Sequence, residues 1–205
     1  MEAAATLGLA PSRELPGDKA GRIVEAMRVS VAARGIAGAT FDHVAREAGV
    51  SRGLLHYYFG TKERLLVEVV RLESDVRIQR IEDGIADATT PDDVIAVLVQ
   101  TFEDFLGEGP APAVMFFELS TLAQRNAEIA AELAELGRRT REHFADALRA
   151  KSDAGVLSLR ADPEEITTFL FALADGVTVR RLVEPNLDIG PVIKHCTAAA
   201  RALLS

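Results

Sequence analysis

Hydrophobic residues recur every three or four positions along most of the chain, which is the spacing of amphipathic helices. The first such segment, residues 18–34, places Ile23, Met27 and Val31 on one face, with Asp18 as a candidate N-cap and Gly35 as its stop. Shorter segments follow, opened by Thr40 and Ser51, and a fourth starts near Thr61. The pattern predicts helices over residues 18–34, 41–48, 52–58 and 62–83.

The second half of the chain carries longer periodic segments. Thr90 before Pro91 and Asp162 before Pro163 are start signals, because a capping side chain precedes proline at the first helical position. We find no alternating strand pattern and no internal repeat. The sequence therefore predicts an all-α fold of about nine helices, with the later ones near residues 91–106, 110–123, 126–151, 163–184 and 191–204. Residues 1–17, which hold Pro11, Pro16 and Gly17, are expected to be a flexible arm.

The helices predicted over 41–48 and 52–58 are joined by Gly49, Val50 and Ser51. Two short helices joined by a three-residue turn with glycine are typical of a helix-turn-helix, whose second helix enters the DNA major groove. Helical spacing turns one set of side chains inward, namely Phe41, Val44, Ala45, Val50, Leu55 and Phe59. The second helix keeps an outward set, namely Arg52, Gly53, His56 and Tyr57.

This outward set has chemistry suited to DNA. Arg52 can donate paired N–H groups to guanine or phosphate, and Gly53 permits close backbone approach. His56 and Tyr57 can bond phosphates or stack on sugars and thymine methyl groups. Thr40 and Lys62 stand at the starts of the flanking helices, where they can hold the DNA backbone. For Tyr58 two interpretations stay open: a packed ring, or a ring whose hydroxyl reaches phosphate.

Charge is distributed unevenly along the chain. The net charge is −8, but residues 1–62 carry eight Lys and Arg against six Asp and Glu, whereas residues 63–205 carry 15 against 25. A mildly basic first part on an acidic remainder is compatible with local DNA contact.

The run from Thr40 to Glu63 resembles the signature of TetR-family repressors: Ala45, Ala-Gly-Val-Ser at 48–51, Gly53, His-Tyr-Tyr-Phe at 56–59 and Lys-Glu at 62–63. The resemblance covers about residues 22–72. It implies that Ser51 and Leu54 also contact DNA; relatives often carry a small polar residue at the position of Leu54. It further implies a DNA-binding domain over 18–63 and a ligand-binding and dimerisation domain over 64–205.

By the same resemblance, the last two helices form a four-helix bundle with a second subunit. Residues 169–177 support this, because they are apolar almost all round, and small residues would allow close helix approach. Those small residues are Ala172, Ala174 and Gly176, and then Ala198, Ala199, Ala200 and Ala202. The alternative is a helix buried within its own domain. A two-fold dimer would require a pseudopalindromic operator in double-stranded DNA.

Aromatic and Met side chains gather in the middle helices, which predicts an apolar cavity with a few polar groups. The candidate ligand contacts are Phe102, Phe105, Met115, Phe116, Glu118, Leu119, Phe144, Phe171 and Asp175. Either Glu118 or Asp175 could meet a cationic ligand, or pair with Arg181 or another arginine. The expected ligand is a largely apolar small molecule.

Two other classes of protein fit the sequence less well. An enzyme is not expected, because His43, His56, His143 and His195 show no metal-binding spacing and no phosphate loop or nucleophile elbow is present. We therefore expect no catalytic residues, no metal and no cofactor. A helical adaptor would leave the residues around the second short helix without a role.

The single cysteine, Cys196, excludes an intrachain disulfide, and no run reaches the about 18 apolar residues of a membrane span. The expectation is thus a cytoplasmic, homodimeric DNA-binding repressor released by a small molecule, with no membrane partner. The alternative is an activator or dual regulator of the same fold.

Overall fold

The computed structural model describes residues 18–205, so the predicted arm over 1–17 lies outside the described residues. Residues 18–205 form nine α-helices and no strand, as the sequence predicts. The described part of the chain divides into two compact units, residues 18–62 and 63–205. No helix in the described part is long and apolar enough to cross a membrane.

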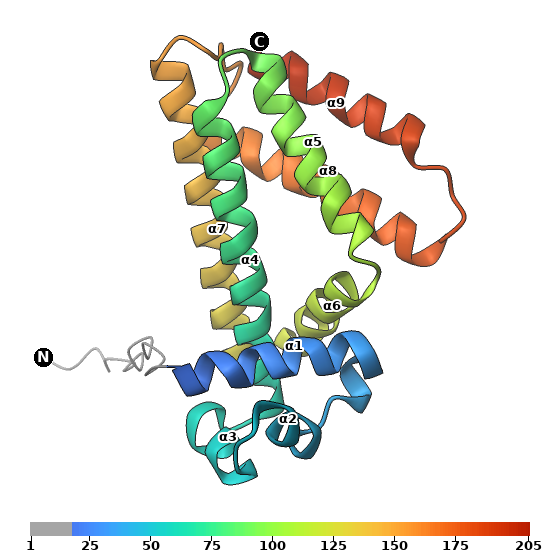
Figure 1. Ribbon diagram of the computed structural model, residues 1–205. Coiled ribbons are helices and arrows are strands. Elements are labelled where there is room, and N and C mark those ends of the chain that lie inside the picture. The colour runs from blue at the N-terminus through green and yellow to red at the C-terminus, as the bar shows by residue number, and fades with distance from the viewer. Residues whose placement is uncertain (1–17) are drawn as a thin grey trace, which may run out of the picture. The chain divides into compact units, whose positions relative to one another are not determined.

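The smaller unit holds α1 (Asp18–Gly38), α2 (Phe41–Ala48) and α3 (Arg52–Phe59) (Figure 1). Gly35 leaves the helical conformation with a φ of 69° and a ψ of 171°, so the predicted stop appears as a kink, after which one short turn runs to Gly38. Helix α2 packs against both α1 and α3. Apolar side chains from the three helices are buried, including Ile23, Met27, Val31, Phe41, Val44, Ala45, Leu55 and Phe59.

The turn between α2 and α3 depends on Gly49, whose φ of 65° is left-handed and ends α2. The predicted cap at Thr40 is confirmed, since its Oγ1 accepts a hydrogen bond of 3.3 Å from the His43 N–H. The prediction of a capping side chain at Ser51 is wrong. There the Leu54 N–H donates to the Ser51 carbonyl at 3.0 Å, which leaves the exposed hydroxyl unused.

The larger unit is built from α4 (Lys62–Asp87), α5 (Pro91–Gly107), α6 (Ala111–Ala123), α7 (Ala127–Asp153), α8 (Pro163–Val183) and α9 (Gly190–Leu204). The start signals at Thr90 and Asp162 are confirmed, because each side chain accepts a hydrogen bond from the first turn of its helix. Asn126, which the sequence analysis did not identify as a cap, does the same for α7. Helix α4 extends beyond the predicted end, because Ile85 is buried and holds the last turn against the core.

Helix α7 packs against α6 and α8, and α9 packs against α5 and α8. One apolar cluster collects side chains from the end of α4, the start of α5, the end of α7, the start of α8 and the end of α9. It contains Ile81, Ile85, Ala88, Val94, Ile95, Phe144, Leu148, Leu157, Ile166 and Leu204. This cluster anchors five helices at one end of the unit.

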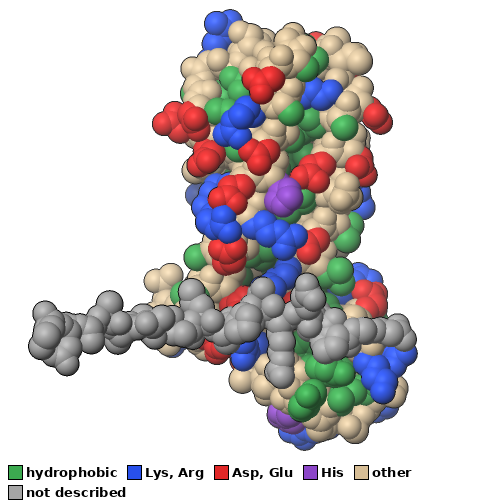
Figure 2. All heavy atoms as spheres, turned by 90° about the vertical axis from the view of Figure 1, so that its left-hand side faces the viewer, with side chains coloured by type: hydrophobic (Ala, Val, Ile, Leu, Met, Phe, Trp, Pro, Cys, Tyr) green, Lys and Arg blue, Asp and Glu red, His purple; other side chains and the backbone are tan. Residues whose placement is uncertain are grey.

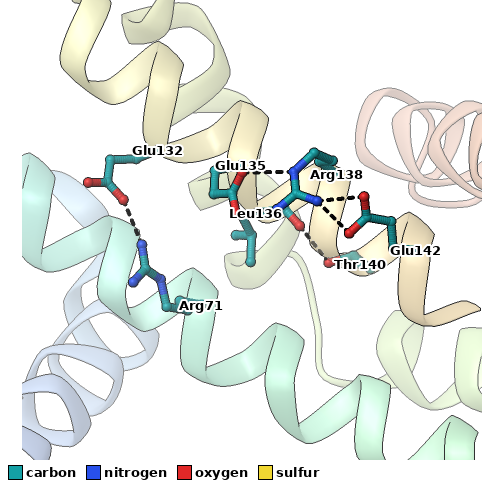
Figure 3. A network of polar contacts seen from close by, with 7 residues as sticks. All are labelled: Arg71, Glu132, Glu135, Leu136, Arg138, Thr140 and Glu142. Atoms are coloured by element: carbon teal, nitrogen blue, oxygen red, sulfur yellow. Dashed lines mark hydrogen bonds and ion pairs between the residues drawn. The ribbon is translucent and has the colours of Figure 1, made fainter. Parts of the chain in front are cut away.

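Helices α4 and α7 lie side by side and run in the same direction, joined by a series of polar contacts (Figure 1). The contacts are Arg64–Glu128 at 3.1 Å, Arg71–Glu132 at 2.6 Å, Asp75–Arg139 at 2.7 Å, Glu82–His143 at 2.7 Å, and Lys151 Nζ with the Ala86 carbonyl at 2.8 Å. Figure 3 shows the Arg71–Glu132 contact beside Arg138, which lies between Glu135 and Glu142. Basic and acidic side chains accordingly alternate over the face in Figure 2.

Candidate functional site

The outer face of α3 carries the side chains that helical spacing predicts to point outward. Arg52, Gly53 and His56 are exposed, and 67% of Tyr57 is accessible. Leu54 and Tyr58 are half-buried at the edge of this face, whereas Leu55 and Phe59 are buried beneath it. Val50, predicted to face inward, is only half-buried. Helix α3 therefore presents a cation, an imidazole and a phenol from one surface.

Two of these side chains are held by neighbours. The Arg52 guanidinium donates to both carboxylate oxygens of Asp42 on α2, at 3.2 and 3.3 Å. The His56 Nδ1 lies 3.1 Å from the Gly60 carbonyl, and its ring meets the edge of Phe41 at 4.8 Å between centroids. Sequence reasoning missed Asp42, because the contact joins residues ten positions apart on different helices.

The flanking candidates have different surroundings. Thr40 is exposed, and its hydroxyl oxygen already serves as the α2 cap. The Lys62 ammonium donates to the Ile36 carbonyl and is half-buried, so it ties the end of α1 to the first residue of α4. Any DNA contact by Lys62 would use its remaining N–H donors.

The larger unit holds a partly open cavity of about 310 Å³ lined by α4, α5, α6, α7, α8 and α9. Its wall holds six phenylalanines, Phe102, Phe105, Phe116, Phe117, Phe144 and Phe171. The rings of Phe144 and Phe171 meet edge to face at 5.1 Å. Five of these six rings and Asp175 are among the candidate ligand contacts from the sequence.

Three candidates do not line the cavity. Met115 and Leu119 are buried in packing contacts, and Glu118 is exposed to solvent. The cavity side of α6 instead carries Pro112, Ala113, Phe116 and Phe117. Composition alone identified the right helix, but it could not assign the face of α6 that looks into the cavity.

Most polar groups in the cavity wall already have partners. Four threonine hydroxyls donate to carbonyls one turn earlier in their own helices, at 2.8 or 2.9 Å: Thr101, Thr140, Thr178 and Thr197. Arg77, which the sequence reading missed, lies over the Phe105 ring at 4.7 Å and 3.8 Å from Glu108. Burial lowers the pKa of Arg77, and Glu108 partly offsets that effect.

Asp175 differs from these groups. Its carboxylate has no hydrogen-bond or ion-pair partner within residues 18–205, and neither Asp175 nor Glu118 pairs with Arg181 there. The side chain remains accessible, yet desolvation by partial burial raises the pKa of Asp175. The cavity thus combines aromatic rings with an unpaired carboxyl group.

A helix-turn-helix unit followed by a helical body with an apolar cavity defines a DNA-binding transcription regulator. The family model for bacterial regulatory proteins of the tetR family matches residues 23–69, and the model for the C-terminal part of BetI-type transcriptional repressors matches residues 91–205. The chain belongs to the TetR family, with a C-terminal part of the BetI type. It is a regulator and not an enzyme.

Relatives agree with this assignment. The regulator BetI of Rhizobium meliloti is 32% identical over 162 residues, spanning 78% of this chain and 75% of the relative. BetI of Agrobacterium fabrum is 30% identical over 161 residues, spanning 77% of this chain and 74% of the relative.

Solved structures share the fold. A TetR-family regulator from Rhodococcus sp. superimposes with a TM-score of 0.74 at 24% identity, covering 91% of this chain and 98% of that one. A regulator from Saccharomonospora viridis, solved in complex with choline, gives a TM-score of 0.64 at 21% identity, covering 91% of this chain and 97% of that one.

Proposed function

We propose that this protein is a dimeric transcriptional repressor that binds a pseudopalindromic operator through α3 and is released when a small molecule fills the cavity. The observation that carries the proposal is the exposed face of α3, where Arg52, His56 and Tyr57 stand on a helix fixed by a buried core. We assign DNA binding to residues 18–63, and ligand binding and dimerisation to residues 64–205.

In the proposed complex, α3 enters the major groove and Arg52 donates to a guanine. Ser51, whose hydroxyl makes no capping bond, donates to a phosphate, as do Tyr57 and Thr40. Lys62 adds a phosphate contact with its remaining donors. Gly53 permits close approach of the backbone to the DNA, and Leu54 contacts a thymine methyl group. His56 contacts a phosphate or a sugar. Tyr58 lies at the edge of the groove.

Dimerisation is proposed through α8 and α9. The exposed side of α8 carries residues spaced three and four apart, Phe169, Ala172, Gly176, Val179 and Val183, which is the spacing of a helix–helix seam. Val183 is 68% accessible and Phe169 44%. Ala174 and Ala200, expected in this contact, instead line the cavity. On α9, Val192 and Ala202 are also exposed.

Helix α4 lines the cavity and is also directly connected in the chain to the DNA-binding unit. It begins at Lys62, three residues after α3 ends, and further along it lines the cavity with Val70, Arg77 and Ile81. A ligand that favours one position of α4 will therefore shift the spacing of the two α3 helices in a dimer. The polar contacts with α7 bind α4 to a second long helix, so we expect the two to respond together.

For the ligand we propose an organic cation with an apolar body. A carboxylate without a partner, in a cavity wall that also holds phenylalanine rings, favours a cation that can contact both the charge and the ring faces. The choline complex of the Saccharomonospora viridis regulator supports this ligand class. The cavity volume of about 310 Å³ leaves room for an apolar chain on the cation.

DNA binding is tested by selecting duplexes from random DNA with the purified protein and measuring fluorescence anisotropy on the enriched and a shuffled duplex. The proposal expects tight, salt-sensitive binding of the enriched duplex as a dimer, and an enriched sequence with two-fold symmetry. Arg52→Ala should relax selection at particular bases. Equal binding of both duplexes, unaltered by Arg52→Ala, would exclude α3 as the reading helix.

Ligand class is tested by titration calorimetry with hexyltrimethylammonium and, as the anionic counterpart, hexanoate. The proposal expects binding of the cation only, and its loss in Asp175→Asn, which keeps the size of the side chain and removes the charge. Glu118→Gln is the matched control, because Glu118 lies outside the cavity wall. Binding of hexanoate, or equal cation binding by Asp175→Asn, would contradict this ligand class.

A further inference from the structure

The guanidinium of Arg52 is held by a carboxylate on the neighbouring helix. Asp42 lies at the second position of α2, and its two oxygens are 3.2 and 3.3 Å from the same Arg52 nitrogen. Both side chains are on the surface, with 58% of Arg52 and 62% of Asp42 accessible. The pair therefore stands on the surface that, in the proposed function, faces DNA.

We propose that Asp42 is a positioning residue for sequence recognition, which directs Arg52 toward a base edge and disfavours its use as a general phosphate contact. This inference rests on the proposed role of α3. An arginine has five N–H donors in a fixed planar fork. Asp42 occupies one terminal nitrogen, so the other terminal nitrogen and Nε remain to meet the two acceptors of guanine.

The negative charge of Asp42 lets Arg52 distinguish a guanine base edge from a phosphate. A phosphate that approached Arg52 would be repelled by the adjacent carboxylate, whereas the N7 and O6 acceptors of guanine carry no net charge. On DNA without the right base, Arg52 must either leave Asp42 or stay unused. Asp42 thus weakens binding to unrelated DNA more than binding to the operator.

Fold stability gives no adequate reason for the contact. Ion pairs between two exposed side chains contribute little to folding. Helix α2 already has its cap from Thr40, and its buried face of Phe41, Val44 and Ala45 packs without Asp42. An acidic residue in the first turn of a helix also interacts with the helix dipole. That effect does not depend on Arg52, which makes the two roles separable.

The test compares Asp42→Asn with Glu47→Gln by anisotropy on the enriched and shuffled duplexes over a salt series. Glu47→Gln is matched, because it removes one exposed negative charge from α2 with no Arg52 contact. Asp42→Asn should tighten binding to the shuffled duplex, lower the preference for the enriched duplex about fivefold, and steepen the salt dependence by about one released counterion. Glu47→Gln should leave the preference unchanged.

The same substitution in an Arg52→Ala background shows whether Asp42 acts through Arg52. There, Asp42→Asn is expected to leave the preference as it is in Arg52→Ala alone, and thermal unfolding should show that the variants are folded. An equal loss of preference in Asp42→Asn and Glu47→Gln would overturn the inference, as would an effect that persists without Arg52. If the unmodified protein shows no preference between duplexes, the proposed function itself fails.

Discussion

Partial burial of Asp175 disfavours the charged form of its carboxyl group. Desolvation raises its pKa, and no cation within the described residues compensates its charge. Groups that bind ligands commonly reduce stability in this way. Asp175→Asn is accordingly expected to raise the thermal unfolding midpoint at pH 7, as measured by circular dichroism, while removing the cation response.

The stability gained in Asp175→Asn is expected to depend on pH. Because the pKa of Asp175 is higher in the folded than in the unfolded chain, its contribution favours folding below the unfolded pKa and is lost as the pH rises through the folded value. The stability advantage of Asp175→Asn should therefore grow as the pH rises from the usual aspartate range and then level off. An advantage that is constant from acid to neutral pH would exclude a titrating Asp175 as its origin.

Tyr57 offers a test of a single proposed phosphate contact. Tyr57→Phe removes only the hydroxyl from a side chain that is 67% accessible, so folding should be unchanged. Loss of one hydrogen bond, about 1 kcal/mol, should weaken binding to enriched and shuffled duplexes alike, about fivefold in anisotropy. Tyr58→Phe decides between the two interpretations of Tyr58, since a ring that only packs loses no affinity. Unchanged affinity in Tyr57→Phe would exclude a hydrogen bond from the Tyr57 hydroxyl to a phosphate.

For individual side chains, the sequence predicted the direction in which they point better than the partners that they contact. Helical spacing correctly turned Arg52, His56 and Tyr57 outward. It could not predict that Arg52 bonds Asp42 or that Lys62 bonds the Ile36 carbonyl, because these contacts depend on side-chain rotamers and on chain segments 10 and 26 residues apart.

Helix starts are encoded locally, and α7 provides the clearest case. The Asn126 side chain accepts hydrogen bonds from the Glu128 and Ile129 N–H groups at 3.1 and 3.2 Å. Asn126→Ala should cost about 1 kcal/mol of unfolding free energy in urea titration, and Asn126→Ser should cost much less because serine also caps. Equal stability of the alanine variant and the unmodified protein would show that this cap contributes nothing.

The helices could be predicted because caps, prolines and glycines act within one turn. The same reasoning failed where tertiary packing decides: Ser51 makes no side-chain cap, and α4 continues past its expected end because Ile85 is buried. The same local signals could not predict which face of α6 lines the cavity. Met115 and Phe116 are equally apolar, and only the packing of the neighbouring helices sends Phe116 to the cavity and Met115 to the core.

For the whole molecule, the proposed dimer depends on close approach along the exposed side of α8. A side chain added at Gly176 would meet no atom within 4 Å in one chain, so Gly176→Leu should fold but obstruct the seam. Light scattering is expected to show a monomer, or a dimer at least about tenfold weaker, for this variant. Gly107→Leu is the control, because that helical glycine also has open space around it. A Gly176→Leu dimer as tight as that of the control would place the interface elsewhere.

We propose that one molecule holds DNA through α3 and releases it when the cavity is filled. This proposal is tested most directly by adding hexyltrimethylammonium to the complex with the enriched duplex and following release by anisotropy. We expect the unmodified protein to release the duplex, and Asp175→Asn to bind the duplex equally well but to retain it at the same cation concentration. Retention by both proteins, while calorimetry shows the cation bound to the unmodified one, would contradict coupling between the cavity and α3.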